Sequence, residues 1–278
     1  MLSDVETMKF SNINNMDSKF FNPIKYLLTS SIRLEIMLTL NESKKNFKEI
    51  KKIVNKQDTN ILRALKELEN EDWIINHQKI YSLTSIGFLT IQNTINVINT
   101  WYAVNTMDNY WDNHNLNGIP LNILRYVDVW RHAKLISSTI IEYNKAVNCY
   151  LNNISKSKEI KVILPIFSKF YIEGILDSIQ KNNGKLELIT SNEILNAIKE
   201  SDLKEQFTQL KDQKKLRIWI GESETHKLFL TFTDKFSSIQ LFYFDQTFDD
   251  SNILITKDID KNRFNEIFNE YKNEYKEI

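Results

Sequence analysis

This chain of 278 residues has few of the residues that punctuate or cross-link a fold: five Gly, three Pro and one Cys. Because Cys149 is the only cysteine, no internal disulfide can form. The glycines are too few for the Gly-rich loops that hold nucleotide phosphates. The four histidines lack the spacing of zinc ligands, because they form no HxxxH pair and have no cysteine nearby. We therefore expect neither a metal site nor a cofactor.

Long apolar runs and an excess of one charge are also missing. No apolar segment approaches the roughly 20 residues needed to cross a bilayer, and residues 1–15 lack the apolar stretch of a signal peptide. The chain has 36 basic and 36 acidic residues, a formal net charge of zero, and 42% hydrophobic residues. These values predict a globular protein of the cytoplasm with no membrane partner, long enough for two modest domains.

Residues 24–54 show two successive helical patterns. Ser30 or Ser31 can cap the first helix, which then has a stripe of apolar residues at helical spacing. After a short polar break, residues 47–54 repeat the pattern with lysines on the outer side. The residues predicted to face inward in this second, short helix are Phe47, Ile50, Ile53 and Val54.

A third helix and a hairpin follow directly. Asp58 is a good N-cap, and Ile61, Leu65 and Leu68 recur at helical spacing, so they should face inward. Residues 73–83 are β-branched and aromatic around a polar tip, which is typical of a β-hairpin. Three helices followed by a hairpin predict a winged helix-turn-helix domain over residues 20–90, and double-stranded DNA is the first partner to expect. The third helix would then present these residues outward: Thr59, Asn60, Arg63, Lys66 and Glu67.

Positive charge is concentrated within this region. Residues 44–66 contain eight Lys or Arg residues against only Glu49 and Asp58. Such a concentration is an electrostatic footprint for phosphate, although a solvated face of a lysine-rich protein would look the same. We expect Lys44, Lys48, Lys52 and Lys56 to contact phosphates. Thr59, Asn60 and Arg63, with Lys66 on the same face, should reach base edges, and Arg63 is the strongest candidate for readout. The hairpin tip offers His77, Gln78 and Lys79.

A long connector helix is predicted over residues 85–112. Thr84 can cap it, and Gly87 in its first turn would allow close packing against the hairpin. Two adjacent apolar stripes follow, so the helix needs two partners. One can be its own domain and the other the same helix of a second copy, as in a twofold dimer that binds two half-sites. The alternative is a helix buried entirely within one chain.

The strongest loop signal, residues 113–120, marks the expected start of a second domain over residues 118–278. Strand and helix patterns alternate there, which predicts parallel strands, and the last strands form a hairpin-like pair that suggests antiparallel additions. The overall class is α+β, with a C-terminal α/β domain. The predicted elements are helix 132–154, strand 161–166, helix 170–182, strand 186–189, helix 193–213, strand 216–220, strands 228–233 and 239–244, and helix 262–275.

Ligands of such sheets usually bind where strands end and loops begin. A small-molecule effector could bind there, or a protein signal could act on the same domain. Each polar residue of these loops can equally be a helix cap or a turn former, so the prediction is a region and not a defined site. Its candidate residues are Ser168, Thr190, Ser191, Asn192, Glu222, Ser223 and Asp234.

Three stretches resemble archaeal winged helix-turn-helix regulators of the methanogenesis regulatory protein (FilR-type) family. They are Ser30-Ser31-Ile32-Arg33-Leu34-Glu35-Ile36-Met37-Leu38, Ile80-Tyr81-Ser82-Leu83-Thr84-Ser85-Ile86-Gly87 and His114-Asn115-Leu116-Asn117-Gly118-Ile119-Pro120. The resemblance implies a transcription regulator whose C-terminal domain is related in fold to phospholipase-D-like sensor domains.

Phospholipase-D chemistry needs an HxK arrangement and a downstream aspartate, in two copies. Here Lys227 directly follows His226, Asp234 lies further on, and no second set exists, so a phosphodiesterase is disfavoured. No GxSxG or HExxH motif is present either, and we expect no enzymatic activity. A second alternative is a protein-interaction adaptor without DNA binding. It is favoured by the acidic residues Glu67, Glu69, Glu71 and Asp72.

Overall fold

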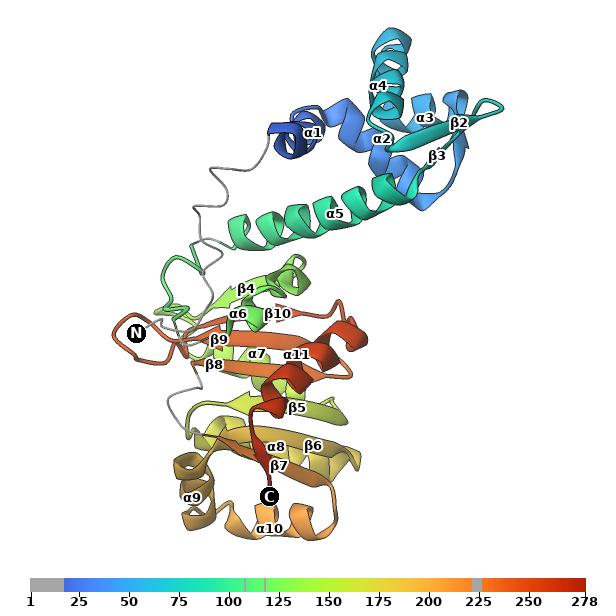
Figure 1. The fold of residues 1–278 in the computed structure, drawn as a ribbon. Coiled ribbons are helices and arrows are strands. Elements are labelled where there is room, and N and C mark those ends of the chain that lie inside the picture. Colours follow the sequence, from blue (N-terminus) through green and yellow to red (C-terminus); the bar gives the residue numbers. More distant parts are fainter. Residues whose placement is uncertain (1–17, 108, 118, 222–226) are drawn as a thin grey trace. The chain divides into compact units, whose positions relative to one another are not determined.

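The computed structural model describes residues 18–107, 109–117, 119–221 and 227–278. It forms two compact units that divide between Val97 and Ile98, within one long helix (Figure 1). Within the described residues, we find no helix with the length and apolar character that a bilayer crossing requires. The two units are described separately below.

The first unit consists of helices around a small sheet. Its core combines apolar residues from every one of the helices α1 to α5, including Ile36, Ile50, Ile61 and Ile91. The strands are all antiparallel, in the order β1-β3-β2. The elements are α1 (Ser18–Leu28), α2 (Ser31–Glu42), β1 (Lys45–Asn46), α3 (Phe47–Val54), α4 (Asp58–Asn70), β2 (Ile74–His77), β3 (Ile80–Leu83) and α5 (Ser85–Asn105).

Local hydrogen bonds explain where these helices begin. The Ser30 side chain accepts from the Arg33 amide, as predicted, and Asn46 forms a capping box with Glu49 at the start of α3. The predicted N-cap of α4 is wrong by one residue. Gln57 occupies the cap position without a side-chain bond, and Asp58 is the first helical residue. From there its carboxylate pairs with Lys51 of α3 at 2.6 Å and favours the positive end of the helix dipole.

Two other local predictions have opposite outcomes. Ile53 was expected to face inward but is 53% exposed, because Ile50 and Val54 already occupy the core side of this two-turn helix. Thr84 does cap α5, accepting a hydrogen bond from the Gly87 amide at 3.0 Å. A Cβ at Gly87 would lie 1.9 Å from the Trp73 carbonyl oxygen, which confirms that glycine permits the close approach to the hairpin.

The second unit is built on an eight-stranded mixed sheet in the order β11-β7-β6-β5-β8-β9-β10-β4. Strands β5, β6 and β7 are parallel and β8 and β9 pair antiparallel, as the sequence predicted, and every other pairing among the described strands is also antiparallel. The strands are β4 (Lys134–Ser137), β5 (Glu159–Leu164), β6 (Lys185–Ser191), β7 (Leu216–Gly221), β8 (Leu228–Thr233), β9 (Ser237–Leu241), β10 (Asn252–Thr256) and β11 (Lys276–Glu277).

Helices cover both faces of this sheet, each over its own apolar core (Figure 1). One face carries α7 (Lys145–Ile154), α8 (Lys169–Asn182), α9 (Asn192–Glu200) and α10 (Lys204–Asp212). The other carries α11 (Lys261–Asn273), α6 (Leu121–Leu124) and the 3₁₀ helix η2 (Val127–Trp130).

Several predicted elements of this unit need correction. The expected helix 132–154 contains strand β4 before α7, because residues 134–137 complete the sheet edge beside β10. The expected helix 193–213 is two helices, since α9 ends at a cap where Ser201 takes an extended backbone. The strand expected at 239–244 is β9, which begins two residues earlier and ends at Leu241. Strands β10 and β11 were not anticipated.

The predicted boundary loop, residues 113–120, lies inside the second unit. Trp111 and Ile119 pack into its core, and His114 is only 3% exposed. The His114 Nε2 atom lies 2.9 Å from Asp249 Oδ2, and its ring stacks on Tyr243. His114 of this segment therefore belongs to a buried hydrogen-bonded cluster of the second unit.

Candidate nucleic-acid interface

One side of α4 is buried and the other is open to solvent. Ile61, Leu65 and Leu68 are at most 1% exposed, as their spacing predicted. The outward candidates Thr59, Asn60, Arg63 and Lys66 are all exposed. Leu62 shares this face and is half exposed, so the open side of α4 is polar with one apolar position.

The lysines predicted to contact phosphate lie on and around α3. Lys44, Lys48, Lys52 and Lys56 are exposed, and among the described residues no ion pair or hydrogen bond engages their side chains. Lys51 differs, because it is paired with Asp58. Four ammonium groups are therefore available to an anionic partner.

The hairpin tip is also exposed. His77 ends β2, and Gln78 and Lys79 form the two-residue turn to β3. Both turn residues have positive φ values, 51° and 67°, the backbone of a type I′ turn. This geometry places one imidazole, one amide and one ammonium group at the end of the hairpin.

Arg63, the main candidate for base readout, is held by a neighbour. Its Nε atom donates to Glu67 Oε1 at 2.8 Å, while its side chain remains 78% exposed. Glu67 was predicted to face outward, but its side chain is only 19% exposed because the other oxygen, Oε2, accepts from Arg33 Nη1 at 2.8 Å. Arg33 lies 3.3 Å from the centre of the Tyr26 ring and donates to the Tyr26 carbonyl. Helices α1, α2 and α4 are thus linked behind Arg63.

This chain of contacts determines the charge of Glu67. Partial burial acts to raise the pKa of the carboxyl, but hydrogen bonds from Arg63 and Arg33 outweigh it, and the pKa is lowered from 4.5. The same carboxylate raises the pKa of Arg63. The sequence analysis missed Arg33 and Tyr26. An arginine inside the apolar stripe of α2 was the available signal, because a buried guanidinium requires an acidic partner.

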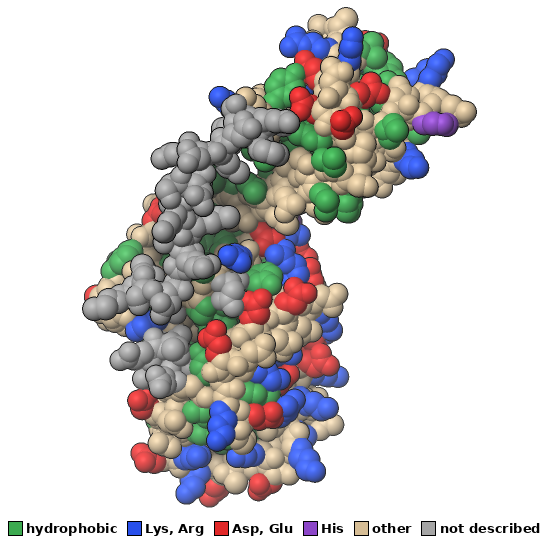
Figure 2. All heavy atoms as spheres, viewed as in Figure 1, with side chains coloured by type: hydrophobic (Ala, Val, Ile, Leu, Met, Phe, Trp, Pro, Cys, Tyr) green, Lys and Arg blue, Asp and Glu red, His purple; other side chains and the backbone are tan. Residues whose placement is uncertain are grey.

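Acidic side chains accompany the basic ones. Figure 2 shows Lys and Arg side chains on the first unit with a group of Asp and Glu side chains beside them. Glu71 and Asp72, directly after α4, are exposed. The charged surface of this unit is therefore mixed, with the four unpaired lysines Lys44, Lys48, Lys52 and Lys56 on and around α3.

The predicted ligand region of the second unit is brought together only in part. Ser168, Thr190, Ser191 and Asn192 lie at or just after the carboxyl ends of β5 and β6, and the polar groups of two of them serve the fold. Thr190 Oγ1 donates to the Leu164 carbonyl, and Ser191 caps α9. Glu222 and Ser223 lie outside the described residues, as does His226.

Asp234 lies at the opposite end of the strands, beside the start of β5. It follows β8, which is antiparallel to β5, and its Oδ1 accepts from the amides of Lys158 and Glu159 at the start of β5. Burial acts to raise its pKa, but these backbone bonds lower it. The structure therefore does not join Asp234 to the other candidates.

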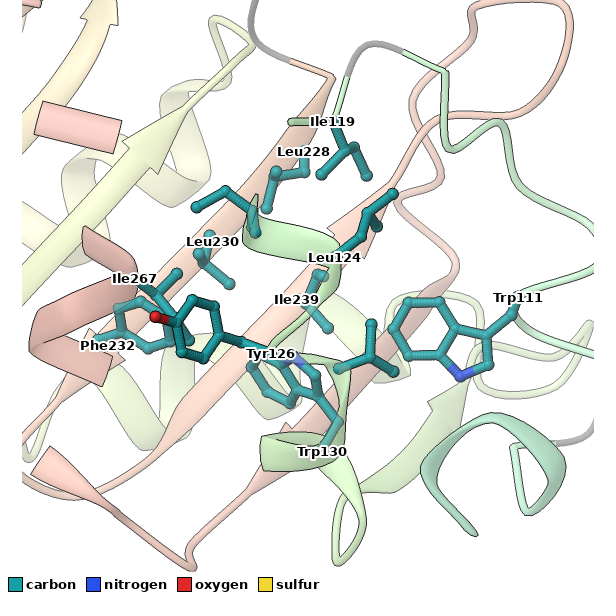
Figure 3. Close-up of a pocket in the computed structure, with 12 residues that line it drawn as sticks. Trp111, Ile119, Leu124, Tyr126, Trp130, Leu228, Leu230, Phe232, Ile239 and Ile267 are labelled. Carbon is teal, nitrogen blue, oxygen red and sulfur yellow. The ribbon is translucent and has the colours of Figure 1, made fainter. Parts of the chain in front are cut away.

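An apolar cavity of about 20 Å³ lies elsewhere in this unit (Figure 3). Leu228, Leu230 and Ile239 of the sheet form one wall. The segment 111–130 covers it with two indole rings, those of Trp111 and Trp130. Asp128 Oδ1 accepts from Arg263 Nη2 at 2.7 Å, which ties this cover to α11.

Catalytic groups are not evident in the part of the chain described here. Within it, no group of three His, Cys, Asp or Glu residues could hold a metal ion. Burial raises the pKa of the half-buried Cys149 thiol, which disfavours the nucleophilic thiolate.

Two family models match the chain. The N-terminal domain of Methanogenesis regulatory protein FilR1 matches residues 21–99, and the middle domain of the same protein matches residues 143–276. Methanogenesis regulatory protein FilR1 of Methanothrix harundinacea (strain 6Ac) is 22% identical over 181 residues. That match covers 63% of this chain but only 39% of the relative, so the chain corresponds to well under half of that protein.

Solved structures are more distant. TrmBL2, an archaeal chromatin protein, is 10% identical with a TM-score of 0.39, covering 91% of this chain and 98% of that one. NucT from Helicobacter pylori is 12% identical with a TM-score of 0.38, covering 51% of this chain and 96% of that one. Neither similarity is close enough to support a functional argument. The two family models, in contrast, together match most of the chain, residues 21–99 and 143–276. The chain therefore belongs to the family of Methanogenesis regulatory protein FilR1, a family of regulators.

Proposed function

We propose that this chain is a sequence-specific DNA-binding transcription regulator whose first unit is a winged helix-turn-helix. The observation that carries the proposal is the open polar face of α4 beside unpaired lysines on α3. An exposed helix of this kind fits a major groove, where side chains reach base edges. The unpaired lysines supply the sequence-independent attraction to phosphates.

The contacts divide into three groups. Lys44, Lys48, Lys52 and Lys56 bind phosphates and set the position on the duplex. Thr59, Asn60, Arg63 and Lys66 face the bases, with the Arg63 Nε atom held by Glu67 while the side chain stays 78% exposed. The hairpin is the wing, and its tip residues His77, Gln78 and Lys79 contact the minor groove or the backbone.

We further propose that the regulator is a homodimer joined through α5. The side chains of three large apolar residues on this helix are well exposed: Val97 by 62%, Trp101 by 70% and Tyr102 by 52%. Monomeric proteins rarely leave this much apolar surface together in water. A twofold dimer would place two α4 helices at half-sites about one helical turn of DNA apart.

The second unit is the proposed sensor. The apolar cavity of Figure 3, at about 20 Å³, has room for about one water molecule, so an apolar effector would have to displace part of its cover, which follows α5 in the chain. An effector that binds there should change the fluorescence of Trp111 and Trp130, which line the cavity.

The salt dependence of DNA binding tests the central proposal. Affinity for a random duplex should fall steeply between two salt concentrations, because each phosphate contact releases a counterion. A protein-interaction adaptor, the second candidate, is favoured by exposed Glu71 and Asp72. It should bind the duplex weakly at either concentration, and that outcome would replace the regulator by the adaptor.

A further inference from the structure

The loop between β4 and α7 presents apolar side chains entirely to water. Ile140 is 101% exposed, Ile141 95% and Tyr143 78%. Monomeric proteins rarely leave adjacent large apolar residues this open, and such a patch marks an interaction site. We call the segment 140–143 the apolar tip.

The apolar tip is a defined turn. The Thr139 amide donates to the Glu142 carbonyl, and the Glu142 amide donates back to Thr139 Oγ1. Its base is fixed by the Ser138 amide, which donates to the Ser251 carbonyl at 2.7 Å. Because hydrogen bonds fix both the turn and its base, the backbone that carries Ile140 and Ile141 is already ordered. Little conformational entropy should therefore be lost on binding.

A groove lies on the same unit between α7 and α8. It encloses about 350 Å³ and is lined by Leu151 and Phe170, with Glu173, Asp177 and Lys181 along α8. Phe170 is 69% exposed. Gly174 lets Leu151 pack closely against α8 at the floor of the groove, since a Cβ there would lie 2.5 Å from the Leu151 side chain.

The tip and the groove belong to one surface. The tip follows the carboxyl end of β4 and leads directly into α7. Helix α8 begins after the carboxyl end of β5, and β4 and β5 run in the same direction, so both strands end on the same side of the sheet. Both helices cover the same face of the sheet. A protruding apolar turn and a groove on the same face of one unit are what a self-complementary twofold contact requires.

We propose that this surface binds a second copy of the chain, with the apolar tip of each copy in the α7–α8 groove of the other. Taking about 150–250 Å² for an aromatic and about 100 Å² for the apolar part of an isoleucine, the exposed parts of Ile140, Ile141, Tyr143, Phe167 and Phe170 amount to about 400–700 Å². A stable interface needs about 800 Å² from each partner, which the polar rim can complete.

Charge supports the same occupant. Glu142 of the tip is paired with Lys145 at 2.6 Å, and the groove carries Glu173, Asp177 and Lys181, so neither side has a strong excess of one sign. A strongly basic or acidic partner would meet like charges on either side. This contact is separate from the proposed α5 contact and does not depend on DNA binding.

Photo-cross-linking of the full chain tests the proposal without DNA. A benzophenone amino acid at position 141 should give a covalent dimer whose linked peptide contains residues from 169–182. Mixing copies of two isotopic compositions identifies links between chains. The same group at position 121, where Leu121 is also half exposed, is the matched control and should give a yield lower by about fivefold or more.

Phe170→Ser removes an exposed wall of the groove without opening the core, so the fold should persist by circular dichroism. The dimer yield from position 141 should then fall by about fivefold or more. Links from position 141 to other parts of the second chain, no link between chains, or an unchanged yield in Phe170→Ser would each overturn the proposal. A failure of DNA binding would not alter these readouts.

Discussion

The two units illustrate two different uses of positive charge. In the first unit, the side chains of Lys44, Lys48, Lys52 and Lys56 have no hydrogen-bond or ion-pair partner among the described residues. In the second unit, several cations are paired with buried or half-buried carboxylates, as between Arg263 and Asp128, or between Lys161, Glu187 and Lys272.

This difference separates charge that holds a fold from charge kept for a partner. The formal net charge of zero averages the two and conceals both. A paired cation contributes to folding, whereas an unpaired lysine contributes little to folding and can bind phosphate. Substitutions of the two kinds should therefore have opposite profiles, which the following predictions examine.

Asp128→Ala should have the largest effect. Asp128 is 2% exposed and accepts from both terminal nitrogens of Arg263, so its removal leaves a partly buried guanidinium unpaired. We expect a loss of about 3–5 kcal/mol in the free energy of unfolding of the second unit. Urea unfolding followed by tryptophan fluorescence measures it. Binding to random duplex should be unchanged, and a parallel loss of binding would contradict the separation of roles.

Arg63→Ala should come next and act mainly on binding, with only a small loss of stability from its exposed bond to Glu67. Loss of the guanidinium should weaken binding to the cognate duplex by about 5- to 150-fold while scrambled duplex is affected much less. Competition titrations on the two duplexes measure the ratio. Lys66→Ala, on the same helix, is the control and should change the ratio less. Equal losses on both duplexes would remove Arg63 from base readout.

Glu67→Gln should give a smaller, pH-dependent effect. The pKa of Glu67 is lowered from 4.5 in the folded state, so the ionised carboxylate stabilises the fold fully above that pH. The contribution is lost as the pH falls through the lowered folded value. Wild-type chain should therefore exceed Glu67→Gln in stability at pH 6, and the difference should shrink toward pH 3. A constant difference would show that the carboxylate charge is unimportant.

Lys52→Ala should have the smallest effect. One phosphate contact fewer should reduce the slope of log affinity against log salt by about 1, equally for cognate and scrambled duplex. Lys51→Ala is the matched control, because Lys51 is already paired with Asp58. If Lys51→Ala lowers the slope as much as Lys52→Ala, pairing does not distinguish the two lysines.

Periodicity and capping chemistry predicted much of the first unit. Helix α3 has the predicted limits, and the Ser30 cap, the Thr84 cap and the close approach at Gly87 were all read from single residues. These features depend on neighbours a few residues away. The link between Arg33, Glu67 and Tyr26 joins three helices, and no local pattern indicates which acidic residue a buried arginine will meet.

The second unit was less predictable for the same reason. Strand β4 is only four residues long and exists because β10 offers an edge, a pairing that spans more than a hundred residues. The sequence analysis grouped Asp234 with the loops after β5 and β6. The antiparallel pairing of β8 with β5 places it instead at the opposite end of these strands, beside the start of β5. The direction of a strand within a sheet determines which loops meet, and single-strand patterns do not contain it.

The hairpin turn has a consequence for engineering. Gln78 and Lys79 both adopt left-handed backbone, which Asn-Gly would adopt with less strain. A programme that selects only for heat resistance would favour that replacement, which keeps a side-chain amide at position 78 but removes the Lys79 ammonium group from the end of the hairpin. Variants of this protein that withstand higher temperatures should accordingly be checked for weaker binding to DNA.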